Sequence, residues 1–346
     1  MDVIGVYTFD WRLTMICRKL ISLCLVMIIL AVGCRTGITD TPVLTQTPTA
    51  VTNMPLPITE NTPVSTIQAT PVTPTPQQPT VTPTPTQIPI LPVEAAQNRV
   101  VELLADNGDC RLPCLWGITP GLNNNQFAEE ILVPLSSISD FVAFTPDVGN
   151  ITFDIPIGEM RIHINVDFLI TIDVITRLSF QARALEYFKN EQDFGSRSVF
   201  NSDAFGEHLH LFMLPQILNE YGVPESVYVF TFPEEPPARY GSETFQITLL
   251  YPDQGILVEY TTQLRVEGEN VLGCFSNAHV EMELTPIGDR DLFFEHIVPS
   301  WQGVIDHDKP LEEATSMTLE EFYETFRQHS DQCLETPSEI WPTAEN

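Results

Sequence analysis

Hydrophobic and polar positions alternate most clearly in residues 160–168. Polar and apolar side chains follow one another there in the order Arg161, Ile162, His163, Ile164, Asn165, Val166, Asp167 and Phe168. A period of two is typical of an antiparallel strand with one buried and one hydrated face. We therefore predict a half-buried strand in this segment.

Other short apolar runs predict further strands. They are residues 151–157, 169–175, 178–182, 227–232, 245–251, 256–262 and 279–284. Two of these runs are joined by Pro252-Asp-Gln-Gly255, and proline and glycine in this order favour a tight turn. The runs on either side of that turn are expected to form a hairpin.

Helices are predicted where apolar residues recur at spacings of three and four. Residues 94–107 have this spacing and end at Asn-Gly, a common helix stop. Cap residues mark three more helices. One begins after Asn123 or Asn124, one ends at Tyr221-Gly222, and one begins at Thr318 with Glu321 in a capping box.

The order of these elements predicts the fold class. A helix in residues 123–135 precedes strands in residues 140–182, and a helix in residues 211–222 precedes strands in residues 227–284. We predict an α+β fold of two halves, each a small antiparallel sheet covered by a helix. The first half would span residues 93–200, and the second, with a C-terminal helix, residues 201–346.

The N-terminal segment has the pattern of an export signal. Arg18 and Lys19 precede an apolar run that ends at Gly33-Cys34, and this run is too short to span a bilayer comfortably. The end of the run resembles a bacterial lipobox, which implies lipidation of Cys34. The signal peptide would be residues 1–33, and Met15 would be the true start.

Residues 34–92 contain the lipidated cysteine and a linker of mostly Thr, Pro, Val, Gln and Ile. Proline fixes the backbone and cannot extend a helix or a strand ladder. The segment also lacks the large apolar side chains that would offset its ordering entropy. It is predicted to be a disordered, extended stalk that carries the globular head.

The charge of the chain limits its partners. Sixteen Lys and Arg stand against 46 Asp and Glu, which gives a formal net charge of −30. Phosphate binding needs clustered basic residues, so this balance argues against nucleic acid. With the lipobox, it indicates an extracytoplasmic protein attached to the membrane through its lipid and not through its head.

Four cysteines remain after the signal and the lipidated residue are set aside: Cys110, Cys114, Cys274 and Cys333. An even number outside the cytoplasm indicates disulfide bonds. Three pairings are possible, and we favour Cys110 with Cys114 and Cys274 with Cys333. A redox or zinc role is the alternative, but the four-residue step between the first two is not a C-x-x-C motif.

Two stretches resemble known proteins. Gly117-Ile-Thr-Pro-Gly121 and Leu218-Asn-Glu-Tyr-Gly222-Val-Pro224 resemble helix-leading modules of BamE/SmpA-like lipoproteins and of beta-lactamase inhibitor protein. That resemblance implies helices on an antiparallel sheet whose surface binds another protein. The longer string from Cys110 to Gly121 resembles a group of bacterial lipoproteins with Thr/Pro stalks and implies no activity.

The sequence contains no catalytic or cofactor motif. Trp116 and Trp301 are candidate ligand-binding residues, and His208-Leu-His210 is the closest histidine pair, although neither these histidines nor any cysteine set predicts a metal site. The leading hypothesis is a module that binds an envelope protein or an extracellular ligand. The alternatives are an extracytoplasmic hydrolase or carbohydrate-active enzyme, which needs convergent carboxylates in a cleft, and an inert spacer.

Overall fold

The computed structural model describes residues 87–189, 194–200, 202–231, 244–297, 308–328 and 331–341. They belong to one compact unit, Val81–Asn346. The predicted signal peptide, Cys34, most of the linker and Trp301 lie outside the described residues. The predicted boundaries of the signal peptide and linker therefore stay predictions. Within the described part of the chain, no helix is long and apolar enough to cross a membrane.

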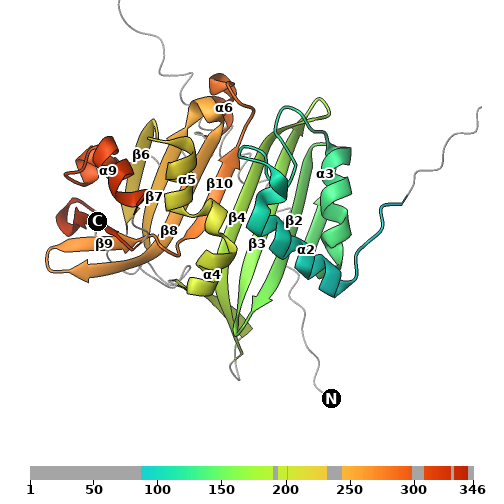
Figure 1. Cartoon of the computed structure of the whole chain (residues 1–346), viewed down its shortest axis with the longest axis horizontal. Helices are drawn as coiled ribbons and strands as arrows, with labels where there is room; N and C mark the ends of the chain where they lie inside the picture. Colours follow the sequence, from blue (N-terminus) through green and yellow to red (C-terminus); the bar gives the residue numbers. More distant parts are fainter. Residues whose placement is uncertain are drawn as a thin grey trace, which may run out of the picture. The chain divides into compact units, whose positions relative to one another are not determined.

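One antiparallel sheet forms the body of this unit (Figure 1). Its twelve strands lie in the order β1-β2-β3-β4-β10-β8-β7-β6-β11, with β5 paired to β4, β9 paired to β8, and β12 paired to β9. The strands are β1 Ser139–Phe144, β2 Val148–Ile157, β3 Met160–Thr171, β4 Val174–Lys189, β5 Phe194–Ser198, β6 Ser226–Thr231, β7 Thr244–Tyr251, β8 Ile256–Glu267, β9 Asn270–Cys274, β10 His279–Leu284, β11 Lys309–Pro310 and β12 Cys333–Pro337.

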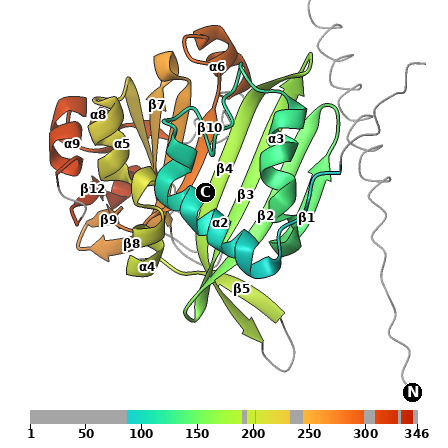
Figure 2. The ribbon, with the colours of Figure 1, turned by 45° about the vertical axis from the view of Figure 1, so that its right-hand side comes forward.

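Helices precede the first strand and lie between later strands in sequence, and most of them pack on one face of the sheet (Figure 2). They are α2 Val93–Asp106, α3 Asn125–Leu132, α4 Asp203–His208, α5 Leu214–Tyr221, α6 Arg290–His296, α8 Leu311–Ala314 and α9 Leu319–Phe326.

The predicted division into two helix-then-sheet halves is wrong. Strand β4 from the first predicted half pairs with β10 from the second, from Leu178 opposite Leu284 to Ala182 opposite Val280. Two separate sheets would leave both of these strands with unpaired backbone groups, whereas the joint ladder satisfies them. The architecture is therefore one continuous antiparallel sheet with few helices.

Most individual elements lie where the sequence pattern places them. The helix caps at Asn124 and Thr318 are confirmed, and each side chain accepts a hydrogen bond from a backbone N–H of its first turn. The predicted strand 169–175 is wrong, because residues 172 and 173 form the turn between β3 and β4. Apolar residues continue on both sides of this turn, so the hydrophobic pattern alone did not predict where the turn lies.

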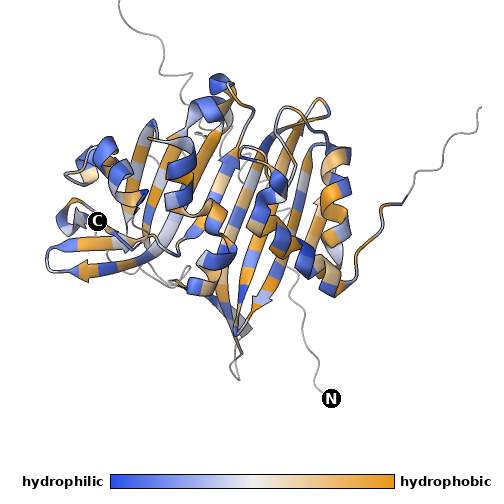
Figure 3. Ribbon diagram, viewed as in Figure 1, coloured by the Kyte–Doolittle hydropathy of each residue, from blue (hydrophilic) through white to orange (hydrophobic). Residues whose placement is uncertain are grey.

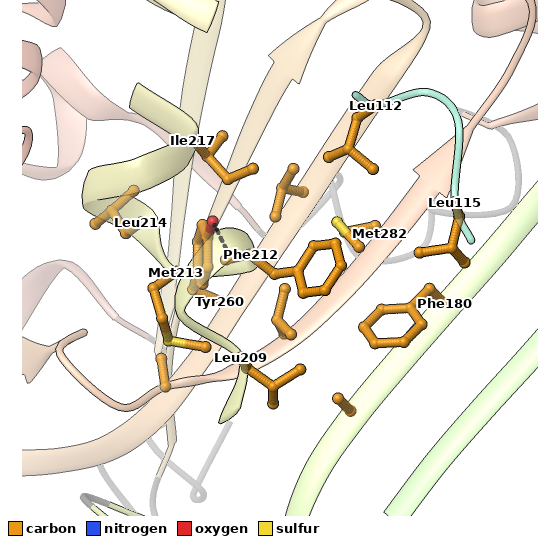
Figure 4. Close-up of a cluster of buried hydrophobic side chains, with 14 of the residues drawn as sticks. Leu112, Leu115, Phe180, Leu209, Phe212, Met213, Leu214, Ile217, Tyr260 and Met282 are labelled. Atoms are coloured by element: carbon orange, nitrogen blue, oxygen red, sulfur yellow. Dashed lines mark hydrogen bonds between the residues drawn. The ribbon is translucent and has the colours of Figure 1, made fainter. Parts of the chain in front are cut away.

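The two faces of the sheet differ in polarity, and Figure 3 shows alternating hydropathy along strands such as β2 and β3. The front face is apolar and forms the core with α2, α3, α5, α8 and α9. In this core the Tyr260 hydroxyl donates a 2.8 Å hydrogen bond to the backbone carbonyl of Phe212, and Phe180 packs beside Phe212 (Figure 4). The buried phenol thus finds the polar partner that its burial requires.

The opposite, back face carries polar side chains over most of its width. One helix, α6, covers a part of it through a small separate cluster of Leu250, Leu257, Phe293 and Ile297. Leu257 belongs to the back face because it lies directly opposite Glu283 on β10, and neighbouring strands direct paired residues to the same side. The polar remainder of the back face extends from β2 to β7.

Candidate functional site

A transverse row of polar side chains crosses the back face. The strand register sets them side by side, each directly opposite the next, in the order Thr152, Asn165, Gln181, Glu281, Glu259 and Thr248. Directly opposite residues on one face have Cβ atoms about 4.5–5.5 Å apart. The row is therefore one contiguous hydrogen-bonding surface drawn from six strands.

Hydrogen bonds fix the side chains at the β2–β3 end of this surface. Asn150 Nδ2 and the Thr152 hydroxyl both donate to Asn165 Oδ1, at 2.9 and 2.6 Å. The amides of Asn150 and Asn165 also donate to the carboxylate of Asp167. These contacts hold the carboxylate in place before any ligand arrives.

A groove of about 370 Å³ opens next to this network. Its polar lining consists of Asp167, Arg177, Ser179, Glu281 and Glu283, and its apolar lining of Val148, Phe168 and Leu169. A concave site with a few fixed polar groups is the usual form of a ligand-binding site. The groove therefore marks the candidate functional site.

Arg177, which is partly buried, and Glu283, which is buried, form an ion pair at one side of the groove. Arg177 Nε donates to Glu283 Oε2 at 2.7 Å and Nη2 donates to Oε1 at 2.6 Å, which is the bidentate geometry. Glu283 is 2% exposed. Burial raises the pKa of Glu283, even though the guanidinium favours its charged form.

Glu259 and Glu281 form a pair of opposed carboxyl groups on β8 and β10. Burial, and then the neighbouring Glu281, raise the pKa of Glu259 to about 8. Gln181 donates to Glu281, and Arg183 Nη2 lies 3.7 Å from it. Two adjacent carboxyl groups with unequal surroundings can act as a proton donor and an anion in one site.

The chemistry of this face is that of hydrogen bonding and cation binding. Carboxylates and amide oxygens accept from ammonium, guanidinium and hydroxyl groups. Within the described ranges, no group of three or more His, Cys, Asp or Glu side chains is arranged to hold a metal ion.

The structure contains the two favoured disulfide bonds, Cys110–Cys114 and Cys274–Cys333. The second joins directly opposite residues of β9 and β12, and so fastens the last strand to the sheet. Neither bond borders the groove. Their positions give them a structural role away from the candidate site.

Trp116 lies in the core and not at the surface. It is 2% exposed, stacks on Phe153 at a centroid distance of 6.0 Å, and meets Phe180 edge-on at 5.8 Å. Trp341 is also buried, and its Nε1 donates to the Thr336 hydroxyl at 3.1 Å. These two rings offer a ligand almost no surface, whereas Trp301 lies outside the described residues.

Asn107 organises the first disulfide loop. Its Nδ2 donates to the carbonyls of Cys110 and Cys114, each at 2.9 Å, and its Oδ1 accepts from the Trp116 N–H at 3.0 Å. Its backbone is left-handed, with φ 54°, a conformation that asparagine tolerates better than most residues. One buried side chain therefore replaces three backbone hydrogen bonds.

We expect Asn107→Ala to lower the free energy of unfolding by about 2–3 kcal/mol, because it leaves buried backbone groups unpaired. Urea unfolding followed by circular dichroism measures the change. Gln126→Ala, at an exposed position of α3, is the control and should stay within about 0.5 kcal/mol of the parent. Equal effects of the two changes would contradict this role of Asn107.

The histidine pair does not converge on one point. His208 Nδ1 contacts the carbonyl of Ala204 at 2.9 Å within its own helix, and His210 lines a second groove of about 440 Å³ with Glu207 and Asp203. This groove lies between the α4–α5 region and the loop at Asn277. The two imidazoles thus have separate surroundings.

Sequence reasoning did not single out the back-face carboxylates. Their signal was present in the alternating run of residues 279–284, where Glu281 and Glu283 occupy the non-core positions of a strand. Carboxylates at such positions usually face water. Only the pairing of β10 with β4 and β8 places them at the centre of a wide sheet.

No family model, no curated protein and no solved structure matches this chain.

Proposed function

We propose that the chain is a lipid-anchored extracytoplasmic protein whose acidic head binds a ligand on the back face of its sheet. The observation that carries this proposal is the groove lined by Asp167, Arg177, Ser179, Glu281 and Glu283. The lipobox-like sequence at Cys34 and the Thr/Pro-rich linker support the extracytoplasmic location.

The groove favours a ligand that carries amino, guanidino or hydroxyl groups. Three of its lining residues are carboxylates and only one is basic, and that arginine is already paired with Glu283. A cationic ligand would also be drawn toward a chain with a net charge of −30. A basic segment of an envelope protein and an amino sugar both have this chemistry.

Affinity capture tests the proposal with three forms of the full chain. The parent, Ser179→Trp and Glu339→Gln are immobilised with disulfides formed, and retained envelope proteins and glycans are identified. Ser179→Trp fills the groove without a change of charge, whereas Glu339→Gln changes an exposed acid elsewhere. We expect a ligand retained by the parent and the control and lost by Ser179→Trp. Retention by all three would place binding elsewhere.

A second candidate function is hydrolysis by general acid catalysis at Glu259 and Glu281. The raised pKa of Glu259, about 8, keeps a proton available beside a second carboxyl group. Glycosides and envelope polysaccharides are the first substrates to assay. Glu259→Gln should lower any turnover by at least about 10²-fold. Turnover that survives both Glu259→Gln and Glu281→Gln would exclude this function.

A further inference from the structure

Three large aliphatic side chains protrude from loops at one end of the sheet. Ile172 is 94% exposed, Leu122 is 81% exposed and Ile287 is 69% exposed, more than any other large hydrophobic residue in the described part of the chain. We call these three residues the apolar tip. Isolated exposed aliphatic residues are ordinary, but a group of them in adjacent loops marks an interaction surface.

The three loops are in contact although they are distant in sequence. The Gly121 N–H donates to the Ile175 carbonyl at 2.7 Å, and the Ile175 N–H donates to the Asn123 carbonyl at 2.9 Å, which joins the Leu122 loop to the start of β4. A Cβ added at Gly121 would lie 2.9 Å from Pro286 Cβ, so the Leu122 loop also touches the Ile287 loop. Figures 1 and 2 place these loops at one end of the sheet.

The backbone at Ile172 shows that the fold does not favour this residue. Ile172 and Asp173 form the two-residue turn between β3 and β4, with φ 51° and φ 59°. Turns with two left-handed residues prefer asparagine and glycine, and a β-branched residue is strained there. A strained and almost fully exposed isoleucine contributes nothing to the core. Its presence at this position is therefore better accounted for by binding than by folding.

The loops hold the tip in a fixed shape. The Thr119 N–H donates to Asn123 Oδ1 at 2.6 Å, and the Leu122 N–H donates to the Thr119 carbonyl at 3.2 Å. On the other side, the Gly288 N–H donates to the Asp253 carbonyl at 3.0 Å. A preorganised surface loses little entropy when it binds.

Two acidic residues adjoin the tip in sequence. Asp173 is in the turn itself, and Asp289 caps α6 next to Ile287. The adjacent Arg290 is held by Glu225 and Asp253, at 2.8 and 2.9 Å, so it offers little free positive charge. This arrangement repels an anionic lipid surface and a second copy of the acidic chain.

We propose that the apolar tip docks into a protein partner that has an apolar pocket bordered by lysine or arginine side chains. The aliphatic side chains fill the pocket, and the carboxylates of Asp173 and Asp289 meet the basic border. This interaction is additional to ligand binding in the back-face groove and does not depend on it.

Site-specific photo-crosslinking of the full chain in its own cells tests the proposal. The probe is p-benzoylphenylalanine at position 122 or 287, with the same residue at position 266 as control, because Val266 is 57% exposed on β8, away from the tip. We expect one polypeptide adduct from both tip positions and none from the control. The crosslinked partner peptide should contain apolar residues next to Lys or Arg.

A substitution at the tip and a change of salt concentration also test the docking. Ile172→Asp should reduce the adduct at least about tenfold, because a carboxylate replaces a buried apolar group. High salt should reduce it as well, because the border contacts are ionic. An adduct with lipid alone, an adduct with a second copy of the chain, or equal adducts from position 266 would each overturn the proposal.

Ile172→Asn separates docking from folding. Asparagine fits the left-handed turn, so the melting temperature should rise by about 2–4 °C, while the adduct should fall because the aliphatic group is lost. Calorimetry and crosslinking on the same variant measure both changes. A variant that is less stable than the parent, or that docks equally well, would contradict the assignment of Ile172 as a binding residue.

Discussion

Arg177→Met is expected to lower the free energy of unfolding by about 3–5 kcal/mol, because it removes the main partner of a buried carboxylate. Glu283 is 2% exposed, and both of its oxygens accept hydrogen bonds from the guanidinium of Arg177. Methionine has a similar length and no charge, so Glu283 would remain buried with its main partner gone. The loss should shrink at low pH, where Glu283 binds a proton and no longer needs a counter-charge.

Urea unfolding of the full chain measures this loss against a matched control. Arg197→Met breaks the ion pair between Arg197 and Glu186, two residues with exposed side chains. It should change the free energy of unfolding by about 1 kcal/mol or less. The double variant Arg177→Met/Glu283→Gln removes the buried charge and should recover part of the loss. If Arg177→Met changes stability no more than Arg197→Met does, the pair is not a buried electrostatic element.

The local elements of this fold could be predicted because their signals are local. The helix ending at Tyr221 stops where Gly222 takes φ 78°, as the glycine indicates. The strand at residues 279–284 coincides with β10, because its alternation matches a half-buried strand. The short edge strand β12 was not predicted, because its five residues of mixed polarity show no clear period.

The pairing of strands could not be predicted in the same way. Alternation shows that residues 178–182 form a strand with one buried face, but it contains no information about the neighbouring strand. The contact between β4 and β10 joins residues about a hundred positions apart, and only the closure of the sheet selects it. Division into two halves followed from element order, which fixes sequence neighbours and not spatial neighbours.

The candidate site escaped prediction for the same reason. Asp167, Glu281 and Glu259 each occupy a hydrated position in the sequence pattern of their own strand. They become one surface only because β3, β4, β10 and β8 are consecutive in the sheet. Trp116 was wrongly predicted to bind a ligand. Its ring stands in a distinctive motif, but it is buried in the core.

The stability of the parent is expected to depend on pH, and Glu259→Gln should remove the part of this dependence that Glu259 contributes. In the folded chain the pKa of Glu259 is raised to about 8, against an ordinary value of 4.5. Between these two values the folded state keeps a proton that the unfolded state has released, so stability falls as pH rises. One such group changes the free energy of unfolding by up to about 1.4 kcal/mol per pH unit.

The charged groups around Glu259 determine this direction. Burial acts first, and the neighbouring carboxylates Glu281 on β10 and Asp308 before β11 add to it, while the Thr261 hydroxyl and Arg183 on β4 oppose it. Burial also raises the pKa of Asp308, to about 7, so this residue contributes a change of the same sign. The parent therefore combines several groups, and only its difference from a variant isolates Glu259.

That difference should be small below about pH 4.5, should grow in favour of Glu259→Gln as pH rises, and should level off above about pH 8, at a total on the order of 5 kcal/mol. Urea unfolding at half-unit steps of pH measures it. Glu320→Gln, which replaces an exposed acid on α9, is the matched control. If the free energies of unfolding of the parent and of Glu259→Gln change with pH in parallel, Glu259 is charged in the folded chain. The proton that the hydrolytic mechanism needs would then be absent.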